Sequence, residues 1–113
     1  MEAYIRKLDA QLADLQAQEK ALAEKNCLDE SNFLKIRINI VNVCKTVCQV
    51  MWKTEAEEKR AEAYLQKLSS FSRSWQEARE KAEKYGREDQ AMIESIKLDT
   101  LQTARNMFEE MKE

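Results

Sequence analysis

The scarcity of residues that end helices or form tight turns is the strongest constraint on how this chain can fold. Proline is absent, and Gly86 is the only glycine among 113 residues. Folds rich in β-strands need turn residues such as Gly, Pro and Asn about every 8–12 residues. Most of the chain instead consists of Ala, Glu, Lys, Gln, Arg, Leu and Met, the residues with the highest helix propensities. We therefore predict an all-α fold that forms a single helical domain over residues 1–113.

The first predicted helix covers about residues 2–25 and has only a narrow apolar seam. The seam residues recur mostly at spacings of three and four: Ile5, Leu8, Leu12, Leu15 and Leu22. Such a seam is typical of coiled-coil-like packing against one neighbour. Asn26 is expected to end this helix in the left-handed conformation, and Asp29 and Ser31 are candidate N-caps of the next helix.

Residues 32–52 form an apolar run inside a chain that is 35% charged. Within it, Ile36, Ile38 and Ile40 alternate with polar residues as in a β-strand, but no other segment has a similar run with which a strand could pair. On a helix, where successive residues turn by about 100°, the run forms two apolar stripes. The first stripe comprises Phe33, Ile36, Ile40, Val43, Val47 and Val50, and the second comprises Leu34, Ile38, Val41, Cys48 and Trp52. We predict a central helix that packs against two or more neighbours.

We predict that this central helix runs from about residue 30 to about residue 69. No Gly, Pro or Asn interrupts residues 53–68. The heptad positions of the preceding helix continue at Thr54, Glu57, Ala61, Tyr64 and Leu68. The alternative is a bend or a break near residues 53–55, because Thr54 and Glu57 fit a capping box that could start a new helix. In that case the chain folds back into a four-helix bundle.

Two further helices are predicted beyond this point. Four serines within residues 69–74 favour an interruption, because serine competes for backbone hydrogen bonds. A short helix at residues 75–85 follows and ends at Gly86, and Asp89 caps a last helix at residues 89–112. The predicted architecture is an elongated helical bundle with coiled-coil-like helix packing.

The length of the central helix predicts self-association. A single helix over residues 33–68 would be about 54 Å long, and the other predicted helices are too short to cover both of its stripes. A second copy of the chain would cover the remaining apolar surface, so we expect a homodimer. The candidate core or interface residues are Phe33, Ile36, Ile40, Val43, Val47, Val50, Trp52, Tyr64, Leu68 and Trp75.

The chain lacks the residues on which most catalytic and cofactor sites depend. It contains no histidine, which removes Ser-His-Asp and Cys-His catalysis and the zinc and di-iron sites that use histidine. One glycine cannot make a glycine-rich phosphate loop. The net charge is −2 with both signs interspersed, which favours neither nucleic acid nor anionic lipid as a partner. We expect a non-enzymatic protein with no cofactor and no small-molecule substrate.

The same residues bear on where the protein works. Lys35, Arg37 and Lys45 lie inside the apolar run, and each would cost about 2.5–3.5 kcal/mol near the centre of a bilayer, so we do not expect a membrane span. The first residues, MEAYIRKLDAQLADL, lack the apolar region of a cleaved secretory signal. Three cysteines do not make a disulfide framework and fit a reducing compartment. We expect a cytoplasmic location.

The cysteines leave a second function open. Cys44 and Cys48 lie four residues apart, so they project from neighbouring turns of a helix. A closed zinc site needs four ligands, and only Cys27 could join them within one chain. We interpret Cys44 and Cys48 as small core residues. The alternative is a thiol- or metal-responsive sensor that uses all three cysteines.

Four segments carry a resemblance to a protein family: D-E-S-N-F-L-K-I-R-I-N-I at 29–40, W-Q-E-A at 75–78, G-R-E-D at 86–89 and I-K-L at 96–98. Together they resemble a group of short, uncharacterised, all-helical proteins from anaerobic Gram-positive bacteria. The resemblance implies a bacterial, all-α protein, and it implies no activity and no site residues.

The residues themselves predict a helical protein–protein interaction or scaffolding protein whose partner is a second copy or another helical protein. An adaptor or export chaperone that binds a partner's helix is a further alternative.

Overall fold

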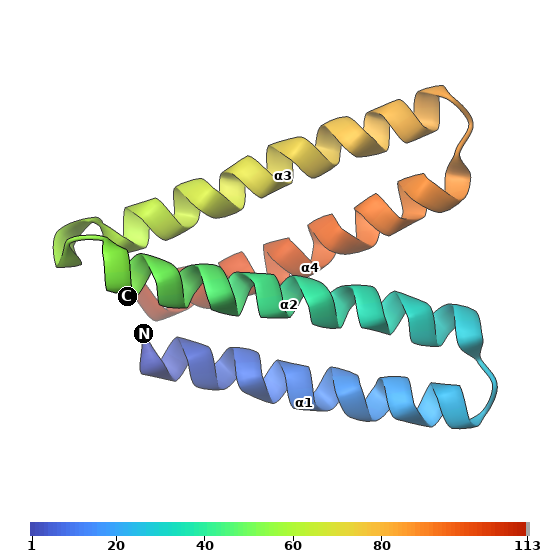
Figure 1. Cartoon of the computed structure of the whole chain (residues 1–113), viewed down its shortest axis with the longest axis horizontal. Coiled ribbons are helices and arrows are strands. Elements are labelled where there is room, and N and C mark those ends of the chain that lie inside the picture. Colours follow the sequence, from blue (N-terminus) through green and yellow to red (C-terminus); the bar gives the residue numbers. More distant parts are fainter. Residues whose placement is uncertain (113) are drawn as a thin grey trace.

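The structure, a computed structural model, describes residues 1–112, and in these residues the chain forms four α-helices joined by short connections (Figure 1). Helix α1 spans Glu2–Glu24, α2 spans Leu28–Thr54, α3 spans Arg60–Lys84 and α4 spans Glu88–Lys112. A 3-10 turn, η1 at Glu57–Lys59, precedes α3. No strand occurs in the described residues, and the prediction of an all-α bundle is confirmed.

Two left-handed residues make the turns inside the two helical hairpins. Asn26 has φ 62° between α1 and α2, and Gly86 has φ 68° between α3 and α4, as the sequence predicts. The predicted caps differ. Helix α2 begins one residue before Asp29 and α4 begins one residue before Asp89, so both carboxylates lie in a first helical turn. Their negative charges there still favour the helix dipole. Ser31 is buried inside α2 and donates a hydrogen bond to Glu19 at 2.9 Å.

The prediction of one helix from residue 30 to residue 69 is wrong. Helix α2 ends at Thr54, and Glu55 has extended dihedral angles of φ −100° and ψ 149°. Ala56 is also extended, with φ −60° and ψ 146°. The chain therefore has the break that the alternative placed near residues 53–55, and it folds back as that alternative predicts.

The predicted interruption at the serines, followed by a separate helix at 75–85, is also wrong. Helix α3 continues through residues 69–74, and residues 75–84 are its last turns. Serine costs only a few tenths of a kcal/mol in a helix. Two of the serine hydroxyls also gain partners, since Ser69 accepts a hydrogen bond from Arg105 and Ser72 accepts one from Gln76. Phe71 and Trp75 stack with ring centroids 5.6 Å apart and pack against the core.

The two hairpins, α1–α2 and α3–α4, pack together mainly through contacts of α2 with α4 and α3. Figure 1 shows them spreading apart towards the end that carries the Asn26 and Gly86 turns. They converge at the other end, where the α2–α3 connection lies. The molecule measures 45 by 35 by 22 Å. None of the helices in residues 1–112 combines the length and the apolar character that crossing a bilayer requires.

The buried face of α2 lies between the two predicted stripes. Its centre is formed by Val41, Cys44 and Cys48, none of which is exposed. The sequence assigned Val41 and Cys48 to the second stripe and left Cys44 out of both stripes. Because α1, α3 and α4 together cover one broad side of α2, the stripes form the flanks of a single buried face rather than two opposite faces.

Ion pairs at the rims of the core fix the neighbours of α2. The Lys45 ammonium lies 2.6 Å from Asp9 of α1. Arg37 lies 2.7 Å from Asp99 of α4 and donates a second hydrogen bond to Thr100 at 3.1 Å. Such partly exposed pairs contribute only about 0–1 kcal/mol each to stability. Their value is that each pair requires a specific alignment of its two helices.

Two leucine substitutions test the core assignment. Leu8 is fully buried in the core cluster, whereas Leu28 is 63% exposed at the start of α2. We expect Leu8→Ala to lower the free energy of unfolding by about 2–5 kcal/mol, because it removes buried methyl groups and leaves a cavity. Leu28→Ala should change it by less than about 0.5 kcal/mol. Urea denaturation monitored by circular dichroism measures both values, and similar losses would contradict the assignment.

Candidate interaction surface

A buried pair of tyrosines connects three helices at the convergent end of the molecule. The hydroxyls of Tyr4 and Tyr64 lie 2.7 Å apart, and the Tyr4 hydroxyl also donates to the carbonyl oxygen of Ala104 at 3.0 Å. A hydroxyl has only one proton to donate. Because the Tyr4 hydroxyl donates its one hydrogen bond to Ala104, the Tyr64 hydroxyl must be the donor in the bond between the two tyrosines. These two hydrogen bonds connect α3 to α1 and α1 to α4.

Aromatic rings complete this cluster. Phe108 packs edge-to-face against Tyr64 at 4.9 Å and against Tyr4 at 5.1 Å between ring centroids, and Trp52 of α2 packs against Phe108 at 6.1 Å. Each such pair contributes about 0.5–1.5 kcal/mol beyond the burial of its area. Trp52 and Tyr64 are among the residues selected from the sequence, whereas Tyr4 and Phe108 are not. The signal for Tyr4 was its place four residues before Leu8, on the same face of α1.

Two thiols lie next to the tyrosines. Cys44 and Cys48 are completely buried on the inner side of α2. Burial raises the pKa of Cys44 to about 12, although the Tyr64 hydroxyl favours its thiolate. Burial also raises the pKa of Cys48 to about 11, against the attraction of the N-terminal ammonium group. Because the thiolate is the form that reacts and binds metals, both thiols are inert in the folded chain.

The third cysteine is far from the other two. Cys27 lies just before the start of α2, 17 residues before Cys44, which corresponds to about 25 Å along a helix axis. In the part of the chain that the structure describes, no three or more Cys, Asp or Glu side chains are grouped to hold a metal ion. The three cysteines of one chain therefore do not meet at one site, as the sensor alternative would require.

The structure separates the ten residues selected from the sequence into a core group and a surface group. Ile40, Tyr64 and Leu68 are buried, and Val47, Trp52 and Trp75 are half-buried against the core. The remaining residues are Phe33, Ile36 and Val43, which are half-buried, and Val50, which is 44% exposed. The surface group belongs entirely to the first stripe of α2.

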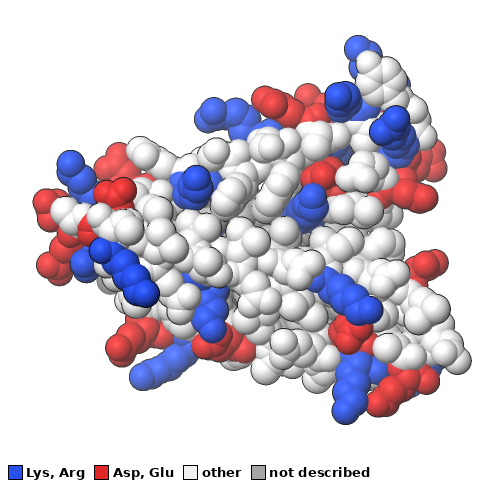
Figure 2. Space-filling view, in the orientation of Figure 1, with Lys and Arg blue, Asp and Glu red and all other residues white. Residues whose placement is uncertain are grey.

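The outer side of α2 is free of charge over more than three turns. Residues 38–52 contain one charged residue, Lys45, and its ammonium is turned towards Asp9 of α1. We call the outward residues of this segment the α2 surface: Asn39, Asn42, Val43, Thr46, Val47, Gln49 and Val50. Figure 2 shows a largely white middle of the visible face, interrupted by a few Lys and Arg side chains, with most Asp and Glu side chains towards the ends and edges. A shallow groove of about 250 Å³ runs along it between Asn42, Val43, Thr46 and Val47.

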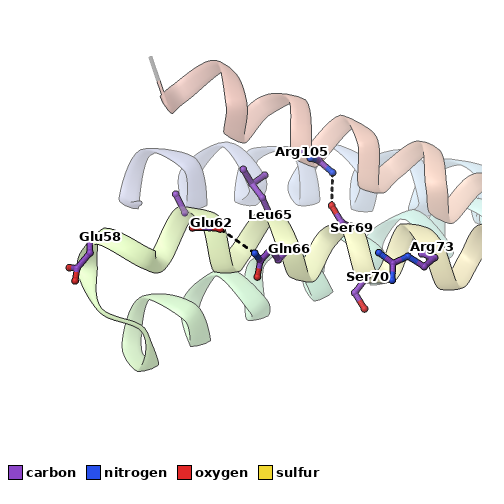
Figure 3. A pocket seen from close by; sticks show the side chains of 9 residues that line it. Glu58, Glu62, Leu65, Gln66, Ser69, Ser70, Arg73 and Arg105 are labelled. Atoms are coloured by element: carbon purple, nitrogen blue, oxygen red, sulfur yellow. Dashed lines mark hydrogen bonds between the residues drawn. The ribbon is translucent and has the colours of Figure 1, made fainter.

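A second and more polar groove lies between α3 and α4 (Figure 3). It measures about 680 Å³, and Arg105 of α4 lies at its edge, donating to Ser69 at 3.0 Å and to Glu109 at 3.1 Å. Gln66 donates to Glu62 at 3.2 Å on the α3 side. Both signs of charge line the groove, and four of its polar residues pair with one another, Arg105 with Ser69 and Gln66 with Glu62. It therefore lacks the concave apolar shape that small molecules select.

One buried carboxylate lies outside both surfaces. Glu94 of α4 is 4% exposed, and its Oε1 accepts hydrogen bonds from Lys97 at 3.1 Å and from Gln90 at 3.3 Å. Lys97 also lies over the ring of Trp75, 5.7 Å from its centroid. The other oxygen, Oε2, has no partner within residues 1–112. The ion pair with Lys97 compensates the burial of this charge.

Comparisons of the chain with protein-family models, with curated proteins and with solved structures found no match. The resemblance to short bacterial helical proteins therefore stays a prediction, and function has to be inferred from the surfaces described above.

The order of donors in the tyrosine pair predicts unequal effects of two similar substitutions. Tyr4→Phe leaves the buried Tyr64 hydroxyl without its acceptor, so we expect a loss of about 1–3 kcal/mol in the free energy of unfolding. Tyr64→Phe leaves the bond from Tyr4 to Ala104 intact and should cost about 0.5–1.5 kcal/mol. Chemical denaturation measures the difference, and a larger loss for Tyr64→Phe would contradict the donor order.

The buried thiols predict a loss of stability at high pH. In the unfolded chain both thiols ionise near their usual pKa of 9.0, whereas in the folded chain burial raises these pKa values to about 12 and about 11. The unfolded state therefore releases protons first, and each thiol lowers the free energy of unfolding by up to about 1.4 kcal/mol per pH unit above pH 9. Denaturation at a series of pH values measures the slope.

The matched control is the double variant Cys44→Ala, Cys48→Ala. It should show a much shallower decline between pH 9 and pH 10, below the usual pKa of 10.0 of the buried tyrosines, whose pKa values burial also raises. An unchanged slope in this variant would mean that the thiols are not the source.

Proposed function

We propose that the protein is a non-enzymatic helical interaction protein that forms a homodimer through the α2 surface. The observation that supports this most directly is that segment 38–52, in a chain that is 35% charged, has Lys45 as its one charged residue, and that Lys45 is turned towards Asp9 of α1. The centres of protein interfaces are depleted of charged residues, whereas solvated helix faces are usually charged. The α2 surface therefore resembles the centre of a protein interface more than a solvated helix face.

The chemistry of the surface favours a second copy as the partner. Asn42, Thr46 and Gln49 each offer both a donor and an acceptor, so they can pair with the same residues of another copy. Val43 and Val50 provide apolar area beside them. In a two-fold symmetric dimer the same patch is used on both subunits, so a patch of neutral, self-complementary groups suits such an interface. A strongly charged partner would find no opposite charge there.

The size of the surface indicates an exchangeable dimer. Residues 39–50 cover about 18 Å along the helix axis, and stable interfaces bury about 800 Å² per partner. The half-buried Phe33 and Ile36 extend the same stripe towards the spread end of the hairpins. Because this length is short for a stable interface, we expect a dimer whose population depends on concentration. The long uncovered helix, which first suggested a dimer, is absent.

The three unpaired cysteines support a reducing, cytoplasmic location as part of this proposal.

The test compares two exposed apolar residues on different helices. Val50 of the α2 surface is 44% exposed, and Met92 of α4 is 52% exposed. We expect Val50→Lys to weaken dimerisation by about tenfold or more, because the interface would have to bury an ammonium group that has no partner there. Met92→Lys should leave dimerisation unchanged. Sedimentation equilibrium from about 1 µM to about 1 mM measures both, and thermal melting verifies that the fold is intact. A Val50→Lys variant that dimerises like the wild type would refute the proposal.

A further inference from the structure

The connection between α2 and α3 interrupts the α-helix although it contains none of the residue types that commonly end helices. Only Glu55 and Ala56 are extended, while residues 57–59 form a 3-10 turn and Arg60 is already helical. The other two turns use a left-handed Asn26 and a left-handed Gly86. The α2–α3 connection, in contrast, lies within the sequence KTEAEEKR, which has no Gly, Pro or Asn. Its local preference is therefore for a continuous helix.

Contacts between the hairpins and within the connection hold the break in place. Arg60 donates from Nε to the carbonyl oxygen of Glu55 at 3.2 Å, which satisfies an acceptor just after the end of α2. Beyond it, Tyr64 is fixed to Tyr4 of the other hairpin. The bent connection is thus a place where tertiary contacts override local propensity, and short hinge connections under strain favour domain swapping.

We propose that the chain exchanges its α3–α4 hairpin with a second copy by straightening at residues 55–59. When Glu55 and Ala56 become helical, α2 and α3 join into one helix from Leu28 to Lys84, about 85 Å long. The α3–α4 hairpin then leaves its own α1–α2 hairpin and packs on that of the other copy. Each contact between the two hairpins of one chain re-forms between hairpins of different chains. The α2–α3 connection of each chain becomes part of a continuous helix.

The proposed partner is a second copy because the surfaces exposed by opening fit only each other. Opening one chain exposes Cys44 and Cys48 on one hairpin and Tyr64, Leu68 and Phe108 on the other, and all of these are buried in the closed form. The open monomer is therefore rare. A second open copy offers the same shapes, the same ion pair of Arg37 with Asp99 and the same tyrosine hydrogen bond. This exchange is independent of the α2 surface.

The variant Ala56→Pro tests the exchange. In the closed form Ala56 has φ −60°, its N–H has no backbone acceptor within residues 1–112, and the preceding Glu55 is extended. Proline is compatible with all three features. In the straightened form, proline would sit in the interior of a helix and clash with the preceding turn. We expect Ala56→Pro to keep the melting temperature at or above that of the wild type and to reduce the exchanged dimer at least about a hundredfold.

Arg60→Ala tests the opposite direction. It removes the bond to the Glu55 carbonyl while keeping a strong helix former, so the dimer fraction should rise at least about threefold. The matched control is Arg79→Ala, which removes an arginine of the same helix whose ion pair is with Glu83 on α3 itself. Arg79→Ala should leave the dimer fraction unchanged.

A distance measurement separates exchange from surface contact. Fluorophores are attached to native Cys27 and to an introduced Lys84→Cys, since the other two cysteines are buried, and labelled chains are diluted into excess unlabelled protein. In the closed form both labels lie within a molecule whose longest dimension is 45 Å. After exchange they stand about 85 Å apart. Energy transfer within one chain is therefore expected to fall in step with dimer formation.

The two variants and the distance measurement together distinguish exchange from dimerisation through the α2 surface. Dimerisation that Ala56→Pro abolishes, with loss of energy transfer in the wild-type dimer, supports exchange even if Val50→Lys has no effect. Dimerisation that Val50→Lys abolishes and Ala56→Pro leaves intact, with energy transfer retained, overturns exchange and supports the α2 surface. A protein that stays monomeric up to about 1 mM overturns both.

Discussion

The hydrogen bond from Tyr64 to Tyr4 is the interaction on which the arrangement of the two hairpins depends. Leucine packing tolerates small rotations of one hairpin against the other, but a buried hydroxyl needs its partner at a fixed distance and direction. Tyr4 donates its own hydrogen bond to the Ala104 carbonyl, so α1, α3 and α4 are aligned by two consecutive hydrogen bonds. The thiols of α2 occupy the remaining space beside them and stay protonated because the same cluster excludes water.

Features determined by a single residue could be predicted from the sequence. Asn26 and Gly86 are left-handed because few other residues adopt that conformation without strain, and the helices on either side begin and end close to the predicted positions. The break at Glu55 and Ala56 is different. It is determined by contacts such as that of Tyr64 with Tyr4, 60 residues away, against the local preference for helix. Within residues 53–60 the Thr54–Glu57 capping box indicated a break, whereas the helix propensities and the absence of Gly, Pro and Asn favoured a straight helix.

The candidate surface was predictable only in part, because its position also depends on contacts between residues far apart in the sequence. Helical periodicity identified the apolar sides of α2, and the sequence shows that Lys45 is the one charged residue in 38–52. Periodicity does not say from which directions the neighbouring helices approach. The sequence therefore could not show that Val41, Cys44 and Cys48 form the buried centre while Val43 and Val50 remain at the surface.

The large sequence separations within the tyrosine cluster have a consequence for biosynthesis. A ribosome releases the chain from its N-terminus, so the α1–α2 hairpin emerges before α3 and α4 do. Tyr4 cannot meet Ala104 until 100 further residues have been made. Until α3 and α4 have emerged, the side of α2 that carries Cys44 and Cys48 has only α1 to cover it. Two thiols that are fully buried in the finished molecule are therefore partly uncovered during synthesis.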